Sequence, residues 1–269
     1  MPDFPCMWEP PRLSSCLIRL SAAMRWPLYL RLFYLTAGTL LPFFWMVVIL
    51  GHRRQRNFER IFFFLCLALV CFFGSSLLAL NAQLYYSNPP HALMRFAWTW
   101  LCLGLWSLPP LVLHTHAEYA ALRGLFRTGR GKTFWLAVAY LPTLPLLPKL
   151  IAALRTVENL NFERPTYLLG PAFQAWLVAA IALSAFWQWR FSRLAAGKEE
   201  KSLYSTLKWM FSGLALVLLA SLWLQERFKP DLMALIAPLL LVVTIAGPFL
   251  KIVEQVNRLS FLAIGGSAT

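Results

Sequence analysis

Residues 61–80 read IFFFLCLALVCFFGSSLLAL, a run of 20 residues without a single Lys, Arg, Asp or Glu. A helix of about this length crosses the roughly 30 Å of hydrocarbon in a bilayer. In lipid, only a helix pairs all of its own backbone N–H and C=O groups within one segment. The run therefore predicts a transmembrane helix and, with it, an integral membrane protein.

The rest of the chain repeats this pattern. Of its 269 residues, 59% are hydrophobic and only 13% are charged, whereas about a quarter are charged in a soluble domain. Seven apolar blocks follow one another, and we predict an all-α fold of seven transmembrane helices. The expected helices cover residues 28–50, 58–82, 93–119, 133–154, 168–190, 203–225 and 231–253. The fourth holds Pro142, Pro145 and Pro148 and should be bent, because each proline removes a backbone donor.

These blocks define a membrane domain over residues 26–254. Residues 1–25 contain no apolar run long enough for a signal peptide, and we expect a disordered extension or an over-extended start. Pro248 should break the last helix. Residues 255–269 should form a cytoplasmic tail. An amphipathic segment leads into it, with apolar residues at three- and four-residue steps.

The basic residues predict the orientation. Three loops hold twelve Lys and Arg, and the three alternate loops hold four. Loops rich in Lys and Arg stay in the cytoplasm, which places the N-terminus outside and the C-terminus inside a bacterial inner membrane. The two groups of loops are 51–60, 120–132 and 190–202, and 83–92, 155–167 and 226–231.

The formal charge of +14 indicates a bilayer and not a nucleic acid as the partner, because the positive residues punctuate the gaps between apolar blocks. The cysteines form no C-x-x-C pair, so no disulfide framework or zinc site is expected. They are Cys6, Cys16, Cys66, Cys71 and Cys102. No nucleotide-binding, hydrolase or kinase motif occurs, and we predict no catalytic, cofactor-binding or metal-binding residue.

One polar group interrupts this pattern, in SLPPLVLHTHAEYAALRGLFRTGRGK at residues 107–132. Successive helical residues turn by about 100°, so His114 and Glu118 share a face while His116 points almost oppositely. A single metal ion bound by all three is therefore not expected. The group is either the polar end of a membrane helix or a functional His114–Glu118 pair, with His116 facing water or headgroups, where its replacement by Ala should be nearly silent.

Helix-breaking residues give further candidate positions for ligand or stimulus. Pro109 and Pro110 should kink the third helix one turn before His114, and Pro248 should interrupt the seventh. Kinks beside polar groups occur where membrane helices move or bind ligands, and they also occur as plain packing features.

Three phrases resemble a known family. They are GHRRQRNFERIFFFLCLALVCFFGSSLLALNAQLYY, WSLPPLVLHTHAEYA and FLKIVEQVNRLSFLAIG, and they are similar to the N-terminal multi-helix sensor region of bacterial sensor histidine kinases of the acidobacterial type. The resemblance spans residues 26 to 265. In that family a dimerisation helix and an ATP-binding domain follow, and this sequence stops at Thr269, where that continuation would begin. The resemblance therefore assigns kinase activity to no residue here.

These observations favour a membrane-embedded sensor module for signal transduction in a two-component system. The resemblance implies a homodimer or a separate histidine kinase as its output partner. Two alternatives stay open: a small transporter or permease-like protein, and a lipid-modifying membrane enzyme that uses His114, His116 and Glu118. Many transporters contain inverted repeats, and no such repeat is evident between the two halves of this sequence.

The charge bias makes the topology testable with fused reporters. Reporters placed after Arg56, Arg127 and Lys198 should report the cytoplasm, and those placed after Ser87, Asn159 and Lys229 should report the outside. Alkaline phosphatase and green fluorescent protein fusions measure the two compartments. If both sides of residues 133–154 reported the same compartment, the seven-helix topology would be wrong.

Overall fold

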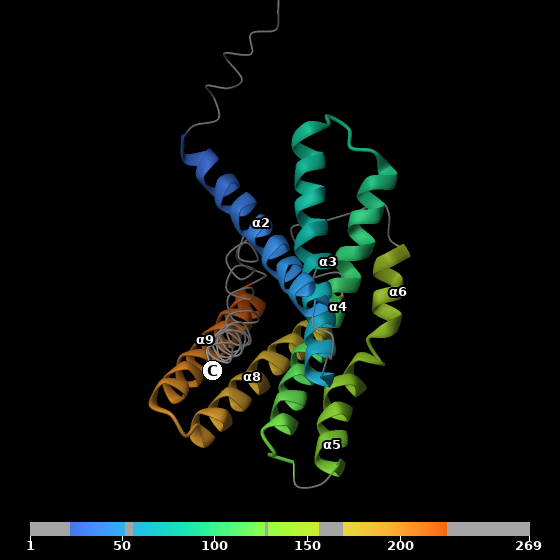
Figure 1. Ribbon diagram of the computed structural model, residues 1–269. Helices are drawn as coiled ribbons and strands as arrows, with labels where there is room; N and C mark the ends of the chain where they lie inside the picture. The colour runs from blue at the N-terminus through green and yellow to red at the C-terminus, as the bar shows by residue number, and fades with distance from the viewer. Residues whose placement is uncertain (1–21, 52–55, 127–128, 156–168, 225–269) are drawn as a thin grey trace, which may run out of the picture.

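The structure is a computed structural model that describes residues 22–51, 56–126, 129–155 and 169–224. Within these ranges the chain is helical, and no strand is present. Figure 1 shows the helices crossing and packing as a bundle. They are α2 (Ala22–Leu50), α3 (Asn57–Tyr85), α4 (His91–Leu122), α5 (Gly129–Tyr140), the 3-10 helix η1 (Leu141–Thr143), α6 (Leu147–Arg155), α8 (Gly170–Leu194) and α9 (Lys198–Leu224).

Five of these helices, namely α2, α3, α4, α8 and α9, are long and apolar enough to cross a membrane. The pair formed by Gly129–Thr143 and Leu147–Arg155 is bent by 40° and would make a sixth span if it crosses as one unit. The chain thus has the make-up of a helical multi-pass membrane protein. The expected seventh helix at 231–253, the break at Pro248 and the tail lie outside the described residues, and the orientation stays a prediction.

The outer surface of the bundle agrees with a lipid environment. On α2, Phe33 is 72% exposed and Leu40 is 60% exposed, and on α9 Leu216 is 66% exposed. Contiguous apolar surface of this kind is rare on soluble monomers. In a bilayer the same side chains contact acyl chains, which replace the missing protein neighbours.

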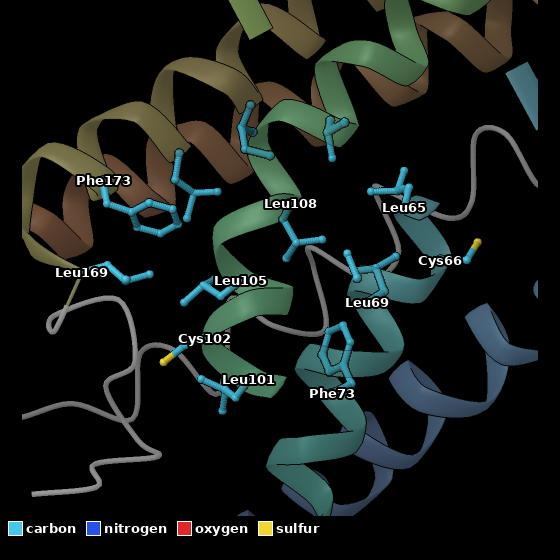
Figure 2. Close-up of a cluster of buried hydrophobic side chains, with 14 of the residues drawn as sticks. Leu65, Cys66, Leu69, Phe73, Leu101, Cys102, Leu105, Leu108, Leu169 and Phe173 are labelled. Atoms are coloured by element: carbon cyan, nitrogen blue, oxygen red, sulfur yellow. The ribbon is translucent and has the colours of Figure 1, made fainter. Parts of the chain in front are cut away.

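The interior is built around α4. Figure 2 shows α4 between α3, which contributes Leu69 and Phe73, and the start of α8, where Leu169 directly precedes the helix and Phe173 lies within it. All four side chains are almost fully buried. The aromatic ring of Phe73 also covers Gly38 of α2, so α3 holds α2 as well. This apolar packing joins α2, α3, α4 and α8 in one core.

Helix α4 differs from its predicted form in one respect. It is longer than the expected 93–119 and remains one α-helix from His91 to Leu122, with the buried Pro109 and Pro110 inside it. Neighbouring helices cover the proline pair, which keeps the helix continuous although two backbone donors are missing.

The bend predicted at Pro142, Pro145 and Pro148 is confirmed, because the helix breaks into α5, η1 and α6. Short-range bonds satisfy the backbone at this break. The amide of Leu144 donates to the carbonyl of Leu141, and the hydroxyl of Thr143 donates to the carbonyl of Tyr140. The break is therefore an ordered turn.

The backbones of α3 and α4 approach each other closely at Gly104 of α4. A Cβ atom added there would lie 2.7 Å from the carbonyl oxygen of Ala68 and 2.8 Å from the amide nitrogen of Phe72, both in the backbone of α3. Backbone atoms cannot rotate away as a flexible side chain can. Only glycine allows α3 and α4 to pack at this distance.

Replacing Gly104 by Ala should therefore lower the free energy of unfolding by about 1–3 kcal/mol, because the two backbones must separate. Gly213→Ala in α9 is the matched control, since a Cβ there meets nothing within 4 Å. We expect the control to be neutral or to raise stability by up to about 1 kcal/mol, because Ala favours a helix over Gly. Denaturant unfolding in detergent micelles measures both, and equal effects would show that the α3–α4 contact is looser than described.

Candidate functional site

Polar side chains gather in the last third of α4 and at Arg123, the residue directly after it, and we call this group the polar end of α4. Its members are His114, His116, Glu118, Tyr119 and Arg123. At successive 100° steps these side chains leave the helix on different sides. Each side meets a different neighbour, so three helices contact the same end of α4 through polar groups.

The first side faces α5. The hydroxyl of Tyr140 lies 2.8 Å from Nδ1 of His114, and Nε2 of His114 lies 3.3 Å from Oε1 of Glu118. The same oxygen is 2.7 Å from Nζ of Lys132. We call these four residues the α4–α5 chain. It contains the predicted His114–Glu118 pair, and it adds partners from α5 on either side of that pair.

This arrangement assigns the hydrogen-bond directions. A carboxylate accepts only, so Nε2–H of His114 and the ammonium of Lys132 both donate to Glu118. Nδ1 of a neutral imidazole then accepts from the hydroxyl of Tyr140. The side chain of Glu118 is 9% exposed and that of Lys132 is 30% exposed, so the chain runs from a buried carboxylate to a partly accessible cation.

The second side faces α8, and here one expectation was wrong. His116 points away from His114 as predicted, but it does not face water or headgroups: it is buried, with Nδ1 2.8 Å from the carbonyl oxygen of Val112. The amide of Gln188 lies 3.1 Å from Nε2. Helical periodicity predicts the direction of His116 around α4, but it does not show that α8 occupies that side.

The carbonyl of Val112 can only accept, so Nδ1 of His116 carries the proton and Nε2 accepts from the amide nitrogen of Gln188. The rings of Phe191 and Phe211 lie 6.4 Å and 5.6 Å from the imidazole. The amide oxygen of Gln188 is buried and has no hydrogen-bond partner among the described residues. His116 is therefore a neutral interhelical hydrogen-bonding group in an aromatic setting.

The third side faces α9, across the end of the bundle. The guanidinium of Arg123 donates to the carboxylate of Glu200 and, at 3.1 Å each, to the hydroxyls of Tyr119 and Tyr204. Tyr204 in turn donates to Glu200 over 3.1 Å. Partial burial alone would lower the pKa of Arg123, but the bonds to Tyr119 and Tyr204 outweigh it, so the pKa is raised and the charge is retained.

The prolines predicted as candidate positions take no part in these contacts. Pro109 and Pro110 are buried one turn before His114, and Pro248 lies outside the described residues. Sequence analysis missed the partners Lys132, Tyr140, Gln188, Glu200 and Tyr204. Gln188 was the detectable one, because an amide inside an apolar block needs a hydrogen-bond partner.

Within the described residues, no group of three or more His, Cys, Asp or Glu side chains is arranged to hold a metal ion. His116 lies on the other side of α4 from the His114–Glu118 pair, which separates the three residues that a shared site would need.

Comparison of the chain with protein-family models, with curated proteins and with solved structures finds no match.

The His116–Gln188 contact leads to a double-mutant test. His116→Leu or Gln188→Leu alone leaves a buried polar group unpaired and should cost about 1–3 kcal/mol of unfolding free energy. The double variant should lose clearly less than the sum, with a coupling of about 0.5–3 kcal/mol. Gln174→Leu, also buried on α8, is the control and should be additive with His116→Leu. A silent His116→Leu would contradict the contact.

Proposed function

We propose that this chain is the signal-input module of a membrane-bound sensor, similar in role to the N-terminal membrane regions of bacterial sensor histidine kinases. The observation that carries the proposal is the polar end of α4, which makes polar contacts with α5, α8 and α9 in an otherwise apolar bundle. A displacement of any one of these helices would change the partners available to α4.

Two properties of these contacts support a signalling role. Hydrogen bonds and ion pairs are directional, so helices joined by them adopt discrete arrangements instead of sliding continuously. Arg123 and Glu200 also join the end of α4 to the first turn of α9, the last described helix before residues 225–269. A change at α4 would thus be passed to α9 and to the chain that follows.

The enzyme alternative is less well supported. It needs His114, His116 and Glu118 at one reacting centre, but His116 is paired with Gln188 on the opposite side of α4 from Glu118. The transporter alternative has no specific contact in its favour. Within the sensor proposal, the module sits in the bacterial inner membrane with its N-terminus outside, and a histidine kinase or a second copy of the chain is its partner.

A chimera tests the proposal. Residues 1–269 are placed before the dimerisation and ATP-binding domains of a sensor histidine kinase, and autophosphorylation is measured in membranes. Arg123→Gln and Glu200→Gln should each shift the ratio of output states in the same direction by roughly two- to thirty-fold, or about 0.5–2 kcal/mol. The reason is that each removes the same contact between α4 and α9.

Arg130→Gln is the matched control, because Arg130 is exposed near the start of α5 and its loss removes the same charge. Its output should equal that of the unchanged chimera. Identical output from all variants would refute the proposed coupling. Turnover of a lipid substrate by the purified chain, lost in His114→Ala, would favour the enzyme alternative instead.

A further inference from the structure

The α4–α5 chain places four titratable groups in one hydrogen-bonded line. Both nitrogens of His114 are engaged, one by the hydroxyl of Tyr140 at 2.8 Å and one by the carboxylate of Glu118 at 3.3 Å. An imidazole held between a phenol and a carboxylate can take up or release a proton at either nitrogen without moving. From Lys132 to Tyr140 the line covers about 12 Å along α5.

The location of this line also indicates function. Ionisable side chains inside a membrane segment are costly, and they mark ion and proton sites by default. Tyr140 is the last residue of α5, directly before the break at η1, and interrupted membrane helices commonly form ion and substrate sites. At the other end of the line, the side chain of Lys132 is 30% exposed in the first turn of α5, and a lysine at a helix end can extend its ammonium to water.

We propose that the α4–α5 chain is a proton-binding site and that the proton is the stimulus to which the module responds. The first part stands on the geometry of the four side chains. The second part rests on the proposed sensor function.

The consequences of proton uptake follow from the hydrogen bonds. In the neutral state the carboxylate of Glu118 accepts from Lys132 and from His114, and the charges of Glu118 and Lys132 cancel. A proton from water that binds Nδ1 of His114 makes both ring nitrogens donors, and the oxygen of Tyr140 turns from donor to acceptor. That bond reverses its direction without being lost, and no bond between heavy atoms forms or breaks.

Two cations then lie beside the same carboxylate oxygen. Oε1 of Glu118 is 3.3 Å from Nε2 of His114 and 2.7 Å from Nζ of Lys132. These cations repel each other at short range. Lys132 is the more exposed of the two, and its long side chain can reach water. Proton uptake therefore releases Lys132 from Glu118 and loosens the first turns of α5 from α4.

Among the described residues, no titratable group outside the α4–α5 chain contacts His114. Its titratable neighbours are Glu118 from α4 and Lys132 and Tyr140 from α5. From α8, on the other side of α4, no titratable side chain contacts His114 in the described ranges. His116 is bonded to Val112 and Gln188 instead, which makes it the natural control.

Amide hydrogen exchange of the full chain in lipid nanodiscs tests the inference between pH 8 and pH 5.5, after correction for the chemical exchange rate. Residues 129–136 should exchange faster at the acid end of this range, where the imidazole of His114 takes up its proton. The exchange rate of these amides should rise by up to about tenfold, which corresponds to a repulsion of about 1.36 kcal/mol between the two cations. His114→Gln and Lys132→Met should each abolish this pH dependence, whereas His116→Gln should keep it.

A wild-type chain without the pH dependence would overturn the inference, and so would its persistence in His114→Gln or Lys132→Met, or its loss in His116→Gln. If His114→Gln does not fold, Lys132→Met decides, because it removes the second cation at a partly exposed position and leaves the imidazole in place. If amide exchange depends on pH as expected but autophosphorylation of the chimera does not, the proton site is supported and the sensor proposal is wrong.

Discussion

The hydrocarbon of a bilayer offers no hydrogen bonds, so every polar group placed in it needs a partner from the protein itself. Most of this chain meets that constraint with helical backbone and apolar side chains. The polar end of α4 is the exception, and α5, α8 and α9 each supply a partner to it through Tyr140, Gln188 and Glu200. These polar contacts add to the apolar packing that residues such as Phe173 of α8 and Phe211 of α9 contribute to the common core.

Close packing of backbone and rings also holds α2, α3 and α4 together. Gly104 brings the backbone of α4 against that of α3, and Phe73 covers Gly38 of α2. Close packing of this kind has few alternatives, because a small displacement produces either overlap or a void. α2, α3 and the first part of α4 are thus closely packed against one another.

The correction at His116 changes how the whole site is understood. With His116 facing lipid headgroups, the polar group would be an ordinary helix end. With His116 buried against Gln188, the same residues become interhelical contacts on two opposite sides of α4. The break after Tyr140 lies next to the same site, because the residue that ends α5 also binds His114. These features together favour coupling between helices over chemistry at a single centre.

The sequence by itself determined that the chain is helical and suited to a membrane, that residues near Pro142 bend, and that His114 and Glu118 share a face. These properties depend on composition and on the local geometry of a helix, which neighbours in sequence decide. Only the tertiary structure decided that Gln188 reaches His116, 72 positions away, and that Glu200 reaches Arg123, 77 positions away. Such pairs follow from how whole helices pack, and hydrophobic periodicity carries no information about which polar side chain of a distant helix arrives at the same depth.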